Sequence, residues 1–245
     1  MLIAIIGGSG LAKLDGLVIT HREVTRTEYG EPSGALTFGK MSGKDVVFLN
    51  RHGPGHTIPP HRVNYRANVF ALKQAGVKQI IAINAVGGID SNLEPVGLVI
   101  PDHIIDYTYD REHTYFGSEH GPVKHVDFTH PYTEKLRKII IDSASRNKIP
   151  VTTTGTYAAT QGPRFETAAE IDRMERDGAT IVGMTGMPEA GLARELDLDY
   201  AVIAVVSNPA AGRSESEISV EEITSMLQQG MNKTRALLEL VIPRL

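Results

Sequence analysis

Three apolar runs constrain the fold of the 245-residue chain more than any other feature. Residues 2–6, 79–84 and 200–206 are mostly apolar and rich in β-branched side chains, which is typical of strands buried on both faces. Residues 61–77 predict a helix ending at Gly76, directly before the second run, so the order is strand, helix, strand. The chain is long enough for one large domain and needs no second one. We therefore expect a single α/β domain over residues 1–245, with a central mixed β-sheet flanked by helices.

Polar or glycine-rich residues follow these strands, where ligands bind in open α/β sheets. Residues 7–10 read GGSG, which suits close approach to a phosphate with Ser9 as a hydroxyl donor. The strand predicted at 45–50 delivers Arg51 and His52, and an arginine in this position can bind phosphate in a bidentate manner. A glycine-rich turn without a ligand and a solvated basic pair remain the alternatives at these two places.

Two other kinds of site are not favoured. A dinucleotide fingerprint would need a glycine where Lys13 stands and a helix after the loop, so a dehydrogenase is not expected. His52, His56 and His61 could suggest a metal, but prolines between them prevent a helical histidine face, and no cysteine or nearby carboxylate completes a ligand set. The sequence therefore predicts no metal.

Residues 160–195 form the densest group of ligand-type residues. The sequence predicts a loop, a helix, a short apolar strand, a turn and a second helix. Phe165 offers a flat apolar face beside the carboxylate of Glu166, so one side chain can stack on a ring while the other bonds its edge. The turn at 183–189 places Thr185 and backbone N–H groups at the start of a helix, which suits an anion. The alternative is a helix pair with a core methionine and a tight turn.

Composition limits the partners. The net charge is −4, so no basic excess attracts nucleic acid or an anionic membrane, and the partner should be a small molecule. The chain has no cysteine, which excludes disulfides and makes a cytoplasmic location the expectation. The apolar start is too short for a membrane span and lacks the basic residues of a signal peptide, so we interpret it as a first strand.

Five separated motifs resemble those of the trimeric purine nucleoside phosphorylases and methylthioadenosine phosphorylases. They are GGSG (7–10), RHG (51–53) with NYRAN (64–68), NAVGGI (84–89), QGPRFET (161–167) and GMTGMPEA (183–190), and they span nearly the whole chain. The resemblance implies phosphorolysis of a purine nucleoside, with inorganic phosphate as co-substrate, no metal or organic cofactor, and a homotrimer.

The resemblance also implies a role for individual residues. The phosphate would be bound by Ser9, Arg51, His52, the amide of Ala85 and Thr185, the ribose by Tyr65 and Met184, and the purine by Phe165 through stacking and by Glu166 and Asn208 at its edge. Of these, Asn208, Glu166 and His52 would be the catalytic residues.

Asn208 bears on which purine is bound, because the methylthioadenosine enzymes carry an aspartate at this position. Hypoxanthine presents a carbonyl and an N1–H, whereas adenine presents an amine and a bare N1. The Glu166 carboxylate can accept from N1–H, and the Asn208 amide can donate to O6 while accepting at N7. The pair therefore predicts a 6-oxopurine.

Val220 bears on the 5′ end of the nucleoside. Phosphorylases that prefer a plain 5′-hydroxyl carry a histidine at the corresponding helix start, and a valine cannot pair a hydroxyl but can pack against a methylthio group. Together the two ends predict S-methyl-5′-thioinosine as substrate, with methylthioadenosine and inosine as alternatives. An anion-binding module without chemistry and a hydrolase that uses water remain as the other classes of function.

Overall fold

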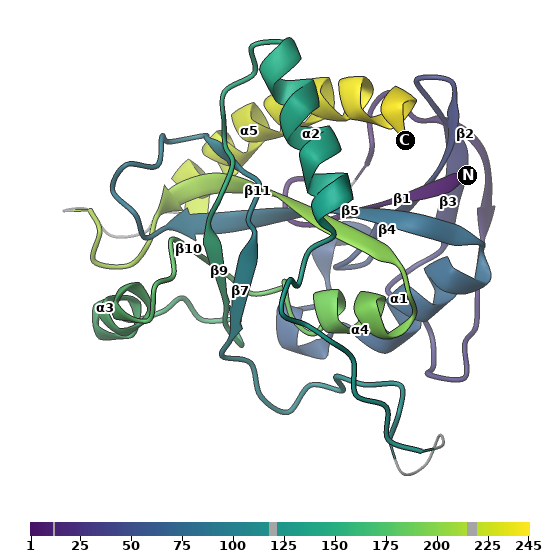
Figure 1. Cartoon of the computed structure of the whole chain (residues 1–245), viewed down its shortest axis with the longest axis horizontal. Helices are drawn as coiled ribbons and strands as arrows, with labels where there is room; N and C mark the ends of the chain where they lie inside the picture. Colours follow the sequence, from purple (N-terminus) through teal and green to yellow (C-terminus); the bar gives the residue numbers. More distant parts are fainter. Residues whose placement is uncertain (12, 118–121, 215–219) are drawn as a thin grey trace.

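The structure, a computed structural model, describes residues 1–11, 13–117, 122–214 and 220–245, without the side chains of Val220 and Glu222. Within these ranges eleven strands form one mixed β-sheet with helices on both faces (Figure 1), which confirms the expected fold class. No helix of the described part is long and apolar enough to cross a membrane.

The centre of the sheet is parallel. β1 (Leu2–Gly7) pairs with β4 (Lys44–Asn50) on one side and with β5 (Val77–Gly88) on the other. β11 (Asp199–Pro209) pairs with the opposite side of β5. The remaining strands are β2 (Val18–Glu23), β3 (Leu36–Met41), β6 (Leu98–Val99), β7 (His103–Asp106), β8 (Val151–Thr152), β9 (Thr156–Ala159) and β10 (Ile181–Gly183).

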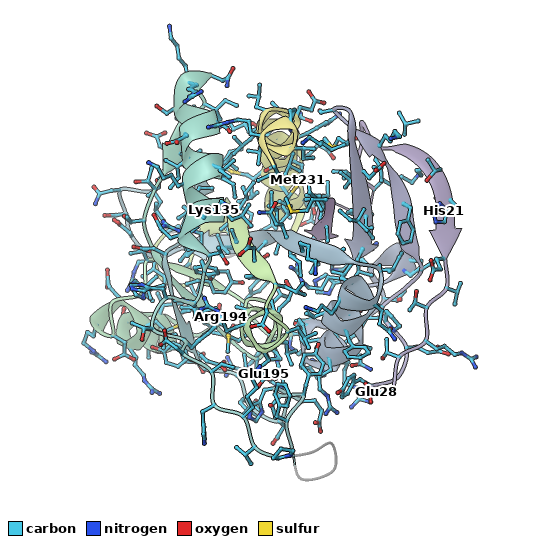
Figure 2. The ribbon with its side chains drawn as sticks, turned by 45° about the vertical axis from the view of Figure 1, so that its right-hand side comes forward. His21, Glu28, Lys135, Arg194, Glu195 and Met231 are labelled. Atoms are coloured by element: carbon cyan, nitrogen blue, oxygen red, sulfur yellow. The ribbon has the colours of Figure 1, made fainter. Side chains whose placement is uncertain are left out.

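Helices cover the two faces in pairs. The helices are α1 (Tyr65–Gln74), α2 (Glu134–Arg146), α3 (Ala168–Arg176), α4 (Glu189–Glu195) and α5 (Val220–Val241), with 3-10 turns at Pro54–His56, Pro60–Arg62 and Ile242–Arg244. α2 and α5 lie over one face and α1 and α4 over the other (Figure 1). Figure 2 shows the same layers, with Lys135 and Met231 on the first pair and Arg194 and Glu195 on α4.

Alternation along β1 produces the two cores. Ile3 and Ile5 belong to the core cluster that includes α2 and α5, whereas Ala4 and Ile6 belong to the cluster that includes α1 and α4. Successive strand residues point to opposite faces, so a run that is apolar at every position is buried on both sides. This is the arrangement that the first apolar run predicts.

One side of β5 changes partner along its length, and this makes room for a site. β1 pairs with β5 as far as Ile6 and Ala82, and β10 pairs with it only from Val182 and Gly87 onward. β11 occupies the opposite side of β5 throughout, down to Gly88. Residues 83–86 therefore face an opening between the carboxyl end of β1 and the carboxyl end of β10, which runs antiparallel to β5.

Several predicted boundaries need correction. Residues 85–88, expected as a loop, are the end of β5, because β10 and β11 both pair with them. The strand expected at 99–105 is two strands, β6 and β7, separated by Pro101, which has no N–H for a ladder. β2 and β8 were not predicted, since β2 is exposed at every residue and so has no buried face to mark it.

Candidate active site

A cavity of about 580 Å³ lies at the opening beside β5. This volume is in the range of small-molecule sites. Most of the residues expected at the site line it, namely Ser9, Arg51, His52, Ala85, Phe165, Glu166, Met184, Thr185 and Asn208. The fold thus brings together residues that directly follow β1 and β4, residues of β5 and β11, and residues of the 160–189 segment.

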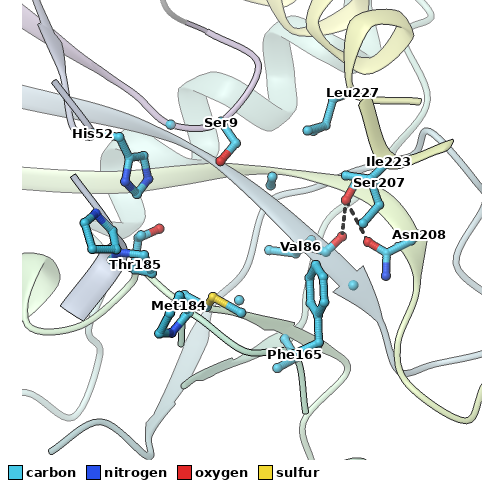
Figure 3. A pocket seen from close by; sticks show the side chains of 18 of the residues that line it. Ser9, His52, Val86, Phe165, Met184, Thr185, Ser207, Asn208, Ile223 and Leu227 are labelled. Atoms are coloured by element: carbon cyan, nitrogen blue, oxygen red, sulfur yellow. Dashed lines mark hydrogen bonds between the residues drawn. The ribbon is translucent and has the colours of Figure 1, made fainter. Parts of the chain in front are cut away.

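The cavity has two polar ends and an apolar middle (Figure 3). Ser9, His52 and Thr185 gather at one end, and Ser207 and Asn208 lie at the other. Met184 and Phe165 lie along one wall between the two ends, and Ile223 and Leu227 of α5 form the wall opposite. The first end suits an anion and the second suits a polar heterocycle.

Arg51 is fully buried and is held by a carboxylate. Its Nε and Nη2 donate to the two carboxylate oxygens of Glu189 at 2.8 and 2.7 Å, and its Nη1 donates to Ile83 O at 3.2 Å. Burial works against the charge, but Glu189 outweighs it and keeps the pKa of Arg51 above its ordinary value. The bidentate contact expected with phosphate is therefore already made with Glu189, since a buried cation needs a close counter-charge. One N–H on Nη1 remains for the cavity.

Gly8 is required for this arrangement. A Cβ at Gly8 would lie 2.6 Å from Ile83 O and 2.8 Å from Arg51 Nη1. Because such distances are not allowed, any other residue would push the guanidinium away from β5. The glycine at position 8 therefore allows Arg51 to lie against β5.

Asn84 connects Arg51 to Thr185. Its side chain is fully buried, its Oδ1 accepts from Arg51 Nη2 at 3.2 Å, and its Nδ2 donates to Thr185 Oγ1 at 3.1 Å. A threonine hydroxyl that accepts from Asn84 keeps its own hydrogen for an acceptor in the cavity. Ile83 O accepts from Arg51, and Ala85 O lies beside Gly183, so both oxygens point to the side of β5 where β1 ends. The N–H and C=O of one strand residue point the same way, so the Ala85 N–H also points to the cavity side.

His52 is neutral at physiological pH. Its Nδ1 lies 2.8 Å from Ile58 O, and the side chain is 4% exposed. Burial, the charge of Arg51 and the neighbouring His56 lower the pKa of His52 to about 4, despite the contact with Ile58. The ring of His56 lies 4.4 Å from that of His52, and its Nε2 lies 3.5 Å from Ser9 Oγ. This end of the cavity thus contains two imidazoles and two hydroxyls.

A bulge in β11 presents Asn208 at the other end. The register with β5 shifts between Val206 and Asn208, and bulges of this kind often redirect a side chain at a site. Ser207 Oγ lies 2.9 Å from Asn208 Oδ1 and 3.2 Å from Val86 O, and Asn208 Nδ2 donates to Pro209 O at 2.7 Å (Figure 3).

Glu166 and Phe165 complete this end of the cavity. Glu166 Oε1 accepts from Thr160 Oγ1 at 2.6 Å, which leaves Oε2 for a ligand. Phe165 is 45% exposed although it lines the cavity. The carboxylate and the Asn208 amide offer acceptors and a donor to the edge of one ring.

Comparison with known proteins decides the family. The model of the phosphorylase superfamily matches residues 2–243. The chain belongs to the phosphorylase superfamily. It is 50% identical over 98% of its length to a probable S-methyl-5′-thioinosine phosphorylase of Pseudomonas syringae, covering 97% of that protein. It is 44% identical over 98% of its length to the 6-oxopurine nucleoside phosphorylase of Pyrococcus furiosus, covering 92% of it.

A solved structure agrees with these relatives. The methylthioadenosine phosphorylase of Schistosoma mansoni in complex with adenine superposes with a TM-score of 0.94 at 33% identity, covering 99% of this chain and 91% of that one. The resemblance to the purine nucleoside and methylthioadenosine phosphorylases is therefore confirmed.

One of the expected substrate residues lies away from the cavity, and the side chain of another lies outside the described residues. Tyr65 does not line the cavity. It is 2% exposed, its hydroxyl donates to Pro60 O at 2.9 Å and accepts from Arg111 Nη1 at 3.3 Å. Its place under Pro60, which does line the cavity, makes it a support for the wall. The side chain of Val220 lies outside the described residues.

Ile223 and Leu227, which the sequence motifs do not include, line the cavity one and two turns after the start of α5. Their spacing of four residues puts them on one face of the helix, and this pattern could have indicated them. Among the described residues, no group of three or more histidine, cysteine, aspartate or glutamate side chains is arranged to hold a metal ion.

We expect His52 to make the phosphorylase less stable in mild acid. The pKa of His52 is about 4 in the folded chain against an ordinary 6.5, so between these values the unfolded chain binds a proton that the folded chain does not. The stability contributed by His52 is complete above pH 6.5 and is lost as the pH falls toward 4, by about 2 kcal/mol near pH 5. Urea unfolding of wild type and His52→Gln at several pH values measures it. If the free energy of unfolding fell equally with pH in the two proteins, the prediction would be wrong.

Proposed function

We propose that this phosphorylase cleaves S-methyl-5′-thioinosine with inorganic phosphate to give hypoxanthine and 5-methylthioribose 1-phosphate. One observation supports it above others: a single cavity joins an anion-suited end, an amide and carboxylate suited to a 6-oxopurine, and an apolar wall from α5. The name of the Pseudomonas syringae relative, a probable S-methyl-5′-thioinosine phosphorylase, agrees with it.

The two polar ends of the cavity suit the two charges that develop in the reaction. Cleavage of the glycosidic bond leaves positive charge on the sugar and negative charge on the departing base. Phosphate bound by Ser9 and Thr185 supplies both an anion beside the sugar and the nucleophile, and Asn208 stabilises the base as charge develops on it. No metal or organic cofactor is needed in this scheme.

The purine end favours a 6-oxopurine. With Thr160 donating to one carboxylate oxygen, Glu166 presents the other to N1–H, and Asn208 can turn its N–H₂ from Pro209 O to O6. Adenine would place the bare N1 against the carboxylate, a mismatch of about 1–3 kcal/mol. Methylthioadenosine is therefore the weaker alternative.

The α5 wall favours an apolar 5′ group. Ile223 and Leu227 have no group to pair a 5′-hydroxyl, whereas packing a methylthio group against them gains about 1 kcal/mol or somewhat more. Inosine is therefore the other alternative, and the 6-oxopurine nucleoside phosphorylase among the relatives keeps it relevant. A module that only binds anions would need neither the purine end nor this wall.

A comparison of three substrates tests the function. Wild type should show the highest kcat/KM on methylthioinosine, above both methylthioadenosine and inosine, and release no base without phosphate. Ile223→Asn adds a partner for a 5′-hydroxyl and should lower the preference for methylthioinosine over inosine about tenfold. Gln229→Ala, on the exposed face of α5, is the matched control and should keep it. Preference for inosine in wild type, or cleavage that ignores phosphate, would overturn the proposal.

We further propose a cytoplasmic homotrimer. Phe165 supports the assembly, because an aromatic side chain that lines the cavity but is 45% exposed is suited to being covered by a neighbouring subunit. Size-exclusion chromatography with light scattering should give three times the chain mass for the active protein. A monomer with full activity would contradict it.

A further inference from the structure

His52 has one ring nitrogen bound to the backbone and one left for the cavity. Nδ1 lies 2.8 Å from Ile58 O, and since a carbonyl oxygen only accepts, Nδ1 carries the hydrogen. In the neutral ring, Nε2 then has a lone pair and no hydrogen. The ring lines the cavity beside Thr185 (Figure 3), and no group among the described residues hydrogen-bonds Nε2.

Burial and the charge of Arg51 keep the His52 ring neutral, and no unpaired cation lines this end of the cavity among the described residues. The pKa of His52 is about 4 because of burial first and then Arg51 and His56. The charge of Arg51 is neutralised by the Glu189 carboxylate, whose oxygen lies 2.7 Å from Arg51 Nη2. Burial also lowers the pKa of His56. Hydrogen bonds, and not net charge, therefore decide which anion fits here.

This end of the cavity presents both hydrogen-bond donors and a hydrogen-bond acceptor. Thr185 keeps its hydroxyl hydrogen because it accepts from Asn84, and Arg51 keeps one N–H on Nη1, so these two groups donate. Nε2 of His52 can only accept. An anion that satisfies all three groups must carry bare oxygens and also one hydroxyl.

We propose that His52 recognises the hydroxyl of hydrogen phosphate and that this contact makes the cavity select phosphate over sulfate. The proposal rests on the proposed function, because it specifies how the phosphate of that reaction is bound. At neutral pH phosphate and arsenate carry at least one hydroxyl, whereas sulfate has the same tetrahedral shape and four bare oxygens. Sulfate would place a lone pair against Nε2, and such an unpaired contact weakens binding roughly 10- to 100-fold.

Anion binding without nucleoside tests this selection. Isothermal titration at pH 7.5 and constant ionic strength should show sulfate binding roughly 10- to 100-fold more weakly than phosphate, and arsenate binding about as tightly as phosphate. His52→Gln presents either an N–H or a carbonyl oxygen, so its preference should fall to about threefold or less. His21→Gln, at an exposed position on β2 outside the cavity, is the matched control and should keep the wild-type ratio. Equal binding of sulfate to wild type, or full selection by His52→Gln, would overturn the proposal.

A second measurement needs no variant. In ¹⁵N-labelled wild type saturated with phosphate at pH 7.5, the His52 ring should carry a single hydrogen, on Nδ1, and a doubly protonated ring in the complex would overturn the proposal. The outcomes also separate the two proposals. Selective phosphate binding without nucleoside cleavage would refute the function alone, and phosphorolysis with equal sulfate binding would refute the role of His52 alone.

Discussion

Glu189→Gln is expected to lower the free energy of unfolding by about 3–5 kcal/mol, because it leaves the Arg51 guanidinium buried without a counter-charge. Both side chains are 0% exposed, so water cannot replace the lost carboxylate. Tyr200 adds to the cost, since its hydroxyl donates to Glu189 Oε1 at 2.8 Å. An amide can accept there but cannot neutralise the arginine. Urea unfolding followed by circular dichroism at one fixed protein concentration measures the loss.

Glu195 is a matched control on the same helix (Figure 2). It is 9% exposed, and its carboxylate accepts from the Thr114 hydroxyl at 2.6 Å and the Tyr115 N–H at 2.8 Å, both neutral donors. Glu195→Gln should therefore cost only about 1 kcal/mol. Similar losses in the two variants would show that removing any buried carboxylate from α4 has this effect and that the pair with Arg51 is not special.

The same pair shows where sequence reasoning stops. Strands ending at ligand-type residues could be predicted because the pattern is local: an apolar run, then GGSG or Arg51-His52. The partner of Arg51 lies 138 residues away, on a different helix, and no periodicity links the two. The sequence therefore predicts Arg51 as a phosphate ligand and does not indicate Glu189 as its partner.

Tyr65 and Leu227 show the same limit in opposite ways. Tyr65 belongs to a motif that resembles a ribose-binding segment, yet its hydroxyl is used by Pro60, because α1 begins behind the segment that forms the wall. Leu227 belongs to no motif, yet it lines the cavity, because α5 packs its apolar face onto the face of the sheet beside the cavity. A motif identifies which residues are near a site, and packing decides which of them face it.

Asn208→Asp is expected to lower kcat/KM on methylthioinosine by roughly 10²–10³-fold. An aspartate has no N–H to donate to O6, and it places a carboxylate where charge develops on the departing base. In the wild type, Asn208 Nδ2 donates to Pro209 O at 2.7 Å. A carboxylate oxygen cannot donate and is repelled by this carbonyl oxygen, so the aspartate side chain should turn into the cavity. There it can accept from the exocyclic amine of adenine, so activity on methylthioadenosine should fall much less. Steady-state kinetics on both substrates measures the change in ratio.

Asn232→Asp, at an exposed position on α5, adds the same charge away from the cavity and should leave both rates unchanged. If Asn208→Asp kept the wild-type ratio of the two substrates, Asn208 would not be reading the 6-position of the purine.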